Sequence, residues 1–104
     1  MYMVIRRGQT RPGKMDEAVQ AAEGELWSVV SSVPGFVEYS FLHMGDVGFS
    51  VNVFETQAAA EESTRRTMDF VRQHSIGVGG VSIMQGPYEI VAQGEVRVHK
   101  VKQA

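Results

Sequence analysis

The 104-residue sequence contains no cysteine, which excludes disulfide bonds and catalysis by a thiolate. It also lacks a surplus of basic charge: the formal net charge is −2, and a protein needs positive charge to neutralise the phosphates of a nucleic acid. Long hydrophobic runs are missing too, because the apolar stretch from Met1 to Arg7 is too short for a signal peptide or a membrane span. These absences predict a cytoplasmic protein that binds neither nucleic acid nor membrane.

Motifs for metals and nucleotides are equally scarce. His43, His74 and His99 fall on three different expected elements, with no acidic residue at ligand spacing near any pair, so we expect no metal site. The glycine-rich stretch Gly77 to Gly80 is not preceded by a strand, and no Lys-Ser or Lys-Thr pair follows it as in a phosphate-binding loop. We interpret this stretch as a connecting loop.

What the sequence does contain is an ordered series of hydrophobic patterns that suits one domain over residues 1–104, with 43% hydrophobic residues. The expected elements are a strand at Tyr2 to Arg7, a helix from near Lys14 to Pro34-Gly35, strands at Phe36 to Met44 and Val47 to Glu55, a helix after Thr56, a loop at Ile76 to Gly80, a short strand or ordered linker at Val81 to Gln85, and a last strand at Tyr88 to Val101. This order predicts an α+β fold of the ferredoxin-like split β-α-β kind, with two helices on one face of an antiparallel sheet.

The two expected helices carry local signals. The apolar stripe of the first follows the helical period and consists of Met15, Val19, Ala22, Leu26, Val30 and Val33. Thr56 is expected to cap the second helix, in which Glu61 and Arg65, and Glu62 and Arg66, are spaced for ion pairs.

The two middle strands are joined by Gly45-Asp46, which predicts an antiparallel hairpin. If Met44 pairs with Val47, one face carries Glu38, Ser40, Leu42, Phe49, Val51 and Val53, and the other carries Val37, Tyr39, Phe41, His43, Ser50, Asn52 and Phe54. Both faces hold large apolar groups, although helices cover only one. The pattern therefore predicts a homodimer in which a second copy covers the other face.

Several short segments resemble a known family. They are Pro12-Gly13-Lys14, Pro34-Gly35-Phe36, and Val51 to Glu55 running into Ala58 to Glu61. Together with the opening strand, they are similar to the antibiotic biosynthesis monooxygenase-like domains of the dimeric α/β barrel superfamily. The resemblance implies two ferredoxin-like subunits joined sheet to sheet, each with a pocket between its sheet and its helices or loops. It also implies that some members oxidise polycyclic phenols or quinols with molecular oxygen and no metal or flavin, hence no cofactor, and that a related subgroup degrades haem.

The chain departs from the family pattern at several positions. Catalytic members often have Trp where this chain has Phe54, Asn where it has Ser50, and His where it has Ser63. Asn52 lies on the same expected face as Ser50 and could substitute for that Asn. The haem-degrading subgroup needs an Asn on the first strand, which is absent here, and a Trp and a His on the second helix, whereas Trp27 lies in the first helix.

Three polar residues are candidates for catalysis. His43 could be a general base that removes a phenolic proton, or simply a strand-end histidine near solvent. Asn52 and Ser50 could donate hydrogen bonds to an anionic oxygen as it forms, or could be buried polar groups satisfied in a dimer contact.

Four further residues are candidates for substrate binding. Tyr39, Phe41 and Phe54 could stack on a flat aromatic ligand, or be plain core residues. Arg6 could bind an anionic substrate, or form a salt bridge at a sheet edge. The prediction is a homodimeric, cofactor-independent monooxygenase that binds a small aromatic ligand. The alternative is a non-catalytic ligand-binding or structural dimer, and haem degradation ranks below both.

Overall fold

The computed structural model describes residues 1–74 and 83–103, apart from the side chain of His74. Its elements are β1 (Tyr2–Gln9), α1 (Met15–Glu23), α2 (Glu25–Ser31), β2 (Phe36–Met44), β3 (Val47–Phe54), α3 (Gln57–His74) and β4 (Glu89–Glu95). The order of strands and helices is the predicted one. The loop predicted at Ile76 to Gly80 lies outside the described residues, as does the start of the segment predicted at Val81 to Gln85.

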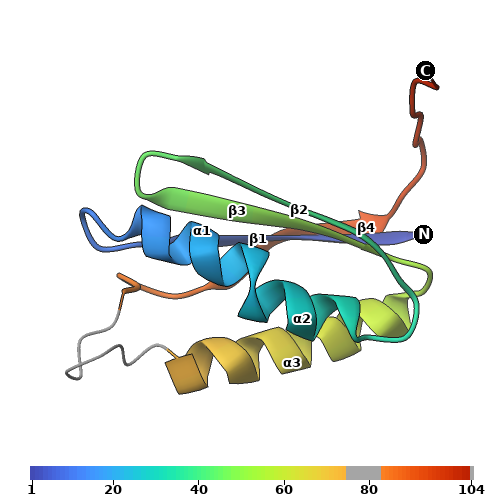
Figure 1. The fold of residues 1–104 in the computed structure, drawn as a ribbon. Helices are drawn as coiled ribbons and strands as arrows, with labels where there is room; N and C mark the ends of the chain where they lie inside the picture. The colour runs from blue at the N-terminus through green and yellow to red at the C-terminus, as the bar shows by residue number, and fades with distance from the viewer. Residues whose placement is uncertain (75–82, 104) are drawn as a thin grey trace.

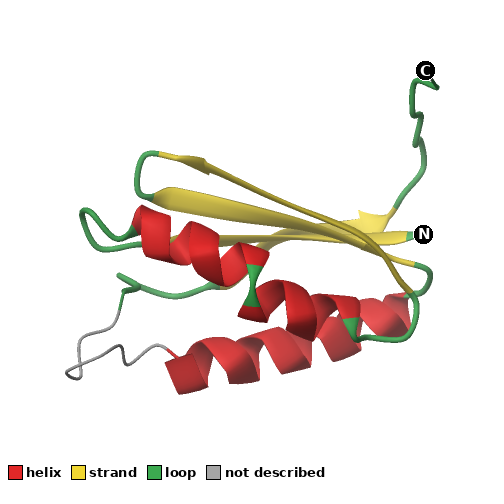
Figure 2. Ribbon diagram, viewed as in Figure 1, coloured by secondary structure: helices red, strands yellow, loops and turns green. Residues whose placement is uncertain are grey.

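The strands form one antiparallel sheet in the order β2-β3-β1-β4. All three helices lie on the same side of this sheet (Figures 1 and 2). The arrangement confirms the predicted α+β, ferredoxin-like fold. Its two inner strands, β1 and β3, run beneath the helices, so most of their helix-facing side chains are buried.

The helix predicted from Lys14 to Pro34 is in fact two helices, separated at Gly24 (Figure 2). Gly24 has φ −104° and ψ −97°, which lies outside the α-helical region, and glycine is a weak helix former. The predicted stripe survives the break: Met15, Ala22, Leu26, Val30 and Val33 are all buried, and Val19 is half-buried. The periodicity was therefore right about the buried face and wrong about continuity.

The predicted hairpin register is confirmed, with Met44 opposite Val47 and Leu42 opposite Phe49. Gly45 has φ +60°, at the first central position of the turn, where a type II′ turn favours glycine. One detail was wrong. The register shifts between Phe36 and Glu38, so Val37 does not continue the alternation and is exposed.

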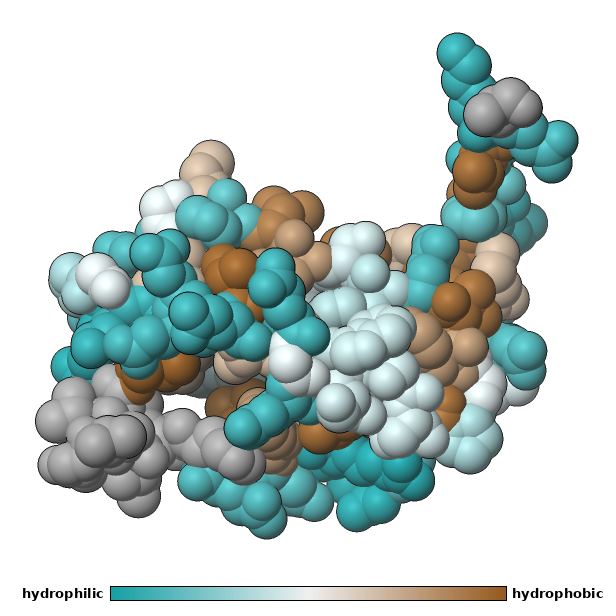
Figure 3. Space-filling model, in the orientation of Figure 1, coloured by the Kyte–Doolittle hydropathy of each residue, from teal (hydrophilic) through white to brown (hydrophobic). Residues whose placement is uncertain are grey.

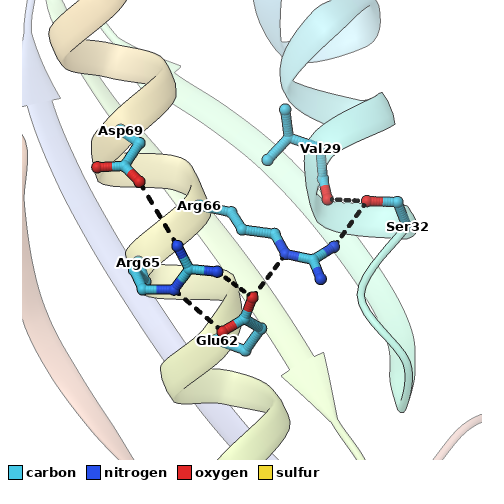
Figure 4. A network of polar contacts seen from close by, with 6 residues as sticks. All are labelled: Val29, Ser32, Glu62, Arg65, Arg66 and Asp69. Atoms are coloured by element: carbon cyan, nitrogen blue, oxygen red, sulfur yellow. Dashed lines mark hydrogen bonds and ion pairs between the residues drawn. The ribbon is translucent and has the colours of Figure 1, made fainter.

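Helix α3 begins with the predicted cap, because the backbone N–H of Ala59 donates to Thr56 Oγ1 at 3.1 Å. On its outer face Glu62 accepts hydrogen bonds from both Arg65 and Arg66, which confirms the predicted pair of Glu62 with Arg66. Arg66 also donates to Ser32 Oγ at 3.3 Å, which links α3 to the end of α2 (Figure 4).

The other ion pair predicted on α3 is wrong. Arg65 pairs with Glu62 and with Asp69, whereas Glu61 accepts a hydrogen bond from Gln57. Glu62 lies three residues before Arg65, a spacing that also brings two side chains together on a helix surface. The i,i+4 spacing alone could not decide between the two carboxylates.

The last strand is shorter than predicted, since β4 ends at Glu95 rather than reaching Val101. Val96 still donates its N–H to the backbone oxygen of Met1 at 2.9 Å. Beyond it the chain leaves the body on the side of the sheet away from the helices (Figure 1), and Val98 and Val101 are 77% and 70% exposed. Within the described residues, no helix is long and apolar enough to cross a membrane.

Candidate functional site

A pocket of about 470 Å³ lies between the helices and the sheet. In the space-filling view, apolar side chains show between the polar outer surfaces of α1 and α3 (Figure 3). The volume falls in the range typical of small-molecule sites. The apolar lining comes from Met15, Ala18, Ala21 and Leu26 of the first two helices, Phe41 of the sheet, Phe70 and Val71 of α3, and Ile83, Met84 and Tyr88 of the segment before β4.

The segment before β4 is held in place by the end of β1. Arg11 donates its N–H to the backbone oxygen of Ile83 at 2.9 Å, and Gln85 donates its N–H to that of Gln9 at 2.8 Å. Thr10 and Met84 also form an isolated bridge. The described part of the predicted linker is therefore ordered, and it carries Tyr88 to the pocket.

Two glycines make room for the floor of the pocket. Gly8 of β1 and Gly48 of β3 are Cα partners in the sheet. A Cβ atom at Gly8 would lie 2.8 Å from Cδ2 of Tyr88, and one at Gly48 would lie 2.8 Å from Cζ of Phe41. Both aromatic rings therefore lie directly on the sheet, where any larger residue would collide with them.

A buried hydrogen-bond network begins at the hydroxyl of Tyr88. Tyr88 Oη lies 2.9 Å from Ser50 Oγ, and Asn52 Nδ2 donates to Ser50 Oγ at 3.1 Å and to the backbone oxygen of Val4 at 3.2 Å. One hydroxyl proton joins Ser50 and Tyr88, so the pair keeps a second proton that it can donate. Burial raises the pKa of Tyr88, which keeps its phenol protonated.

Arg6 extends from β1 toward α3 beside this network, and its Cα partner on β3 is Ser50. The side chain is 0% exposed and donates to Thr64 Oγ1 at 2.8 Å and to Ser63 Oγ at 3.3 Å. Nε and Nη1 have no hydrogen-bond partner among the described residues. The alternative of a sheet-edge salt bridge is therefore wrong, because β1 is an inner strand and Arg6 bonds only to hydroxyls in the described part of the chain.

Tyr39 of β2 lies on the same face, opposite Asn52. Its hydroxyl is buried and has no described hydrogen-bond partner, while its ring lies 6.0 Å from that of Trp27. Burial raises the pKa of Tyr39, and the nearby charge of Arg6 acts in the opposite direction. Tyr39, Phe41 and Trp27 border a second hollow of about 370 Å³, so Phe41 separates the two cavities.

Of the seven predicted site residues, Phe41 alone lines the pocket, and two of the others lie away from the buried group of Arg6, Ser50 and Asn52 as well. His43 is exposed near the turn, with Nδ1 3.1 Å from the backbone oxygen of Gly45. Phe54 is fully buried in the core, where its ring meets that of Phe36 edge-on at 6.1 Å. The structure thus brings Arg6, Ser50 and Asn52 together and leaves these two outside the group.

The sequence did not point to Tyr88, the residue that links the pocket to the network. It follows a segment with no clear periodicity, so nothing local indicated the direction of its side chain. The one available signal was the pair of glycines at positions 8 and 48 within strand patterns, because glycine in a strand often marks a close approach by another group. Across the described residues, no three His, Asp or Glu side chains gather as a metal-ligand set.

The model of the antibiotic biosynthesis monooxygenase family matches residues 1–68, well over half of the chain. The chain belongs to this family. Among curated proteins, none matches it by sequence.

Solved structures show the same fold. A mutant of MhuD with two manganese protoporphyrin IX molecules bound per active site has a TM-score of 0.71 at 15% identity, with 98% of this chain and 100% of that chain covered. A monooxygenase of Streptomyces coelicolor in complex with nanaomycin D has a TM-score of 0.69 at 14% identity, covering 98% and 92%. A further similar structure, from Chloroflexus aurantiacus, is described as a putative member of the family, with a TM-score of 0.63 at 17% identity, covering 97% and 96%.

Proposed function

We propose that this chain is a cytoplasmic, homodimeric, cofactor-independent monooxygenase that oxidises a small aromatic or polycyclic phenol or quinol. The observation that carries the proposal is the double role of Tyr88. Its ring forms part of the floor of an apolar pocket, and its hydroxyl belongs to the buried network of Ser50 and Asn52. A flat ring system could stack on this floor, with an oxygen at its edge accepting a hydrogen bond at the inner end of the pocket.

Family membership and the structural neighbours support the proposal. The neighbours bind nanaomycin D in one case and manganese protoporphyrin IX in the other. In this chain the pocket occupies the space between sheet and helices and is lined mostly by apolar side chains. Hydrogen-bond donors gain in strength beside apolar side chains, which make up most of the lining, while Glu17, Gln20 and Glu25 also belong to it.

The proposed chemistry needs no reductant other than the substrate. In an anthrone-type substrate, loss of a proton from the ring methylene gives an anion whose charge rests largely on the ring oxygen. The anion passes electrons to dioxygen, a carbon–oxygen bond forms, and the resulting hydroperoxide loses water as its O–O bond breaks. The methylene becomes a carbonyl, one oxygen atom enters the product, and the other leaves as water. The Ser50–Tyr88 pair would donate a hydrogen bond to the anionic oxygen in the first step, and Asn52, whose two amide protons go to Val4 O and Ser50 Oγ, would hold Ser50 in place.

The identity of the general base stays a prediction. His43 is on the helix-facing side of the sheet, opposite Gly48, but its side chain is exposed and lies outside the pocket lining. A substrate that reaches the edge of the sheet could meet it there, and the variant His43→Ala tests this directly.

One observation favours the alternative, a non-catalytic ligand-binding dimer. At the positions where catalytic relatives often carry Trp and His, this chain has Phe54 packed in the core and Ser63 bonded to Arg6. Neither side chain is free to act on a ligand in the pocket. In this alternative the protein binds a ligand in the pocket and catalyses no reaction.

The homodimer is supported by the side of the sheet that faces away from the helices. Apolar side chains of all four strands lie there: Met3, Ile5, Leu42, Met44, Val47, Phe49, Val51 and Ala92. None of the described helices covers this face (Figure 1), and Leu42 is 52% exposed. An exposed apolar face is typical of a protein–protein interface.

The deciding experiment measures oxygen uptake by the purified protein with a panel of anthrones and hydroquinones, next to Asn52→Ala, Tyr88→Phe and His43→Ala. We expect uptake above the non-enzymatic rate that falls in Asn52→Ala and Tyr88→Phe. A fall in His43→Ala as well would assign the base. No uptake across the panel by a folded protein that still binds these compounds would reject the monooxygenase in favour of the ligand-binding alternative.

A further inference from the structure

We propose that the pocket selects ligands with an acidic oxygen, either an ionised phenol or a carboxylate, and binds that oxygen as an anion at its inner end, with Arg6 as the balancing positive charge. The inference rests on the proposed function and deepens it, because it specifies the ionic form in which the substrate is held. It stands on three observations: an uncompensated buried cation, an excess of hydrogen-bond donors, and the position of both beside the pocket.

The first observation is that Arg6 carries a buried charge with no counter-charge among residues 1–74 and 83–103. A guanidinium remains protonated in proteins, and burying it without an acid is costly. The bonded partners of Arg6 are the neutral hydroxyls of Ser63 and Thr64, and the titratable groups that act on it are the phenols of Tyr39 and Tyr88. No carboxylate forms an ion pair with Arg6 in the described part of the chain.

The second observation is the count of donors around Arg6. Two guanidinium nitrogens of Arg6, Nε and Nη1, and the hydroxyls of Tyr39 and Thr67 are buried without a described partner. The pair of Ser50 and Tyr88 adds one proton that it can still donate. Among the unpartnered buried side-chain atoms that are described, Asn52 Oδ1 is the one that can accept but not donate a hydrogen bond. The group is therefore rich in donors and positively charged, a composition that favours an anion.

The third observation is the position of this group relative to the pocket. Arg6 precedes Gly8 by two residues on the same face of β1, which places their Cα atoms roughly 7 Å apart. Thr64 and Thr67 lie on α3 shortly before Phe70 and Val71, and the latter two residues line the pocket. The donor group thus lies where the aromatic floor ends.

Arg6 need not touch the ligand to balance its charge. Its free nitrogens are covered by protein atoms, so the direct hydrogen bond to the ligand would come from the Ser50–Tyr88 pair. Arg6 then acts across a few ångströms of protein interior, where charges interact much more strongly than in water. Arg6 and the hydrogen bond from the Ser50–Tyr88 pair favour the ionised form of a phenol bound there, and we expect them to outweigh the desolvation that raises the pKa of Tyr39 and of Tyr88. Ionisation of the bound phenol would ease the first step of the proposed reaction without a base in the pocket.

The test is a binding measurement without turnover. Naphthoate carries an anionic carboxylate, whereas its analogue naphthamide carries a neutral amide in the same place. A third ligand, para-nitrophenol, shows by its absorbance whether it is ionised. For the wild-type protein we expect naphthoate to bind at least about ten-fold more tightly than naphthamide, and the pKa of bound para-nitrophenol to fall by about one unit. Equal affinity for the two naphthyl ligands, or a bound nitrophenol that ionises at higher pH than in solution, would overturn the proposal.

The variants separate a charge effect from a structural one. Arg6→Met removes the charge and keeps the length of the side chain, while Arg7→Met removes the same charge one residue along β1, on the other face of the sheet. We expect the preference for naphthoate to vanish in Arg6→Met, persist in Arg7→Met, and survive in part in Arg6→Lys. A preference that is unchanged in a folded Arg6→Met would contradict the assignment, and if that variant does not fold, the nitrophenol titration of the wild type decides.

Oxygen uptake measured in parallel keeps the two proposals apart. Tight naphthoate binding with no uptake from any anthrone would support the anion site and reject the monooxygenase. Uptake by a protein that binds naphthoate and naphthamide equally would support the monooxygenase and reject the anion site.

Discussion

Ser50 and Tyr88 are separated by 38 residues in sequence, and their hydroxyl oxygens lie 2.9 Å apart, although only Tyr88 lines the pocket. Ser50 belongs to the sheet, and Tyr88 arrives on a segment held by the end of β1. The contact joins the aromatic floor of the pocket to the buried hydrogen bonds of Ser50 and Asn52.

Replacement of Tyr88 by Phe should weaken ligand binding with little loss of stability. The ring can stay on Gly8, but the hydrogen bond to Ser50 and the donor to the ligand are lost. A single hydrogen bond is worth about 1 kcal/mol, which corresponds to a decrease of roughly five- to ten-fold in affinity. Calorimetric titration with naphthoate measures this change, and an unaltered dissociation constant would show that the hydroxyl does not face the ligand.

Replacement of Gly48 by Ala should obstruct the pocket. The new methyl group would lie 2.8 Å from Cζ of Phe41, so the ring must move away from the sheet. We expect a loss of about 1–3 kcal/mol in the free energy of unfolding and weaker ligand binding. Gly94→Ala on β4 is the matched control, because a Cβ atom there meets nothing within 4 Å. If urea denaturation gives the same result for both variants, the close approach of Phe41 to the sheet is not correct.

Removal of the cap of α3 should change stability and leave the pocket intact. Thr56→Ala deletes the side-chain oxygen that accepts from Ala59 N–H, and the loss of such a cap costs about 1 kcal/mol. Thr56 lies outside the pocket lining, so the affinity for naphthoate should not change. If Thr56→Ala lowered the affinity for naphthoate as much as Tyr88→Phe does, the loss of affinity in both variants would reflect a general destabilisation of the fold.

Glu62 should contribute to stability only above acidic pH. Hydrogen bonds from Arg65 and Arg66 lower its pKa from 4.5 to about 2 (Figure 4). Because the folded state has the lower pKa, ionised Glu62 favours folding above pH 4.5, and this contribution is lost as the pH falls toward 2. Thermal melts should therefore show Glu62→Gln to be less stable than the wild type at neutral pH and nearly equal to it near pH 2. A constant difference over this range would contradict the pairing.

A negative charge on the outer face of the sheet should separate the proposed dimer. Leu42 is exposed in the single chain, so Leu42→Glu should leave the folded subunit intact while it places a charge in an apolar interface. Light scattering should give a dimer for the wild type and a monomer for this variant. Gln73→Glu, on the exposed surface of α3, is the control and should remain dimeric. A wild-type monomer would contradict the interface.

The comparison of sequence with structure shows where local patterns suffice. The alternation around Leu42 and Phe49 correctly predicted the hairpin register, since a slip by one residue would move every side chain to the opposite face. The apolar stripe of the first helices also identified the buried face. The same pattern could not reveal the break at Gly24, because the period of buried residues continues from Ala22 to Leu26 across it.

The functional residues were harder to predict, for physical reasons. The alternation of side chains was enough to predict the face of the sheet on which Ser50 and Asn52 lie. The surroundings of Arg6 could be predicted only from the order of the strands in the sheet. Without knowing that β1 is an inner strand, the sequence could not distinguish a buried guanidinium from one at an edge. The position of Tyr88 at the pocket depends on contacts between the segment before β4 and the end of β1. These contacts join residues more than seventy positions apart, so local sequence patterns could not predict them.

The most direct test of the central claim follows the fate of dioxygen. The protein is incubated with anthrone under isotopically labelled dioxygen, and both product and water are analysed by mass spectrometry, next to a protein-free sample and Tyr88→Phe. We predict that one labelled oxygen atom enters the new carbonyl and the other enters water, at a rate well above the protein-free sample and lower in Tyr88→Phe. A rate equal to that of the protein-free sample, or label in neither product nor water, would contradict a cofactor-independent monooxygenase in this pocket.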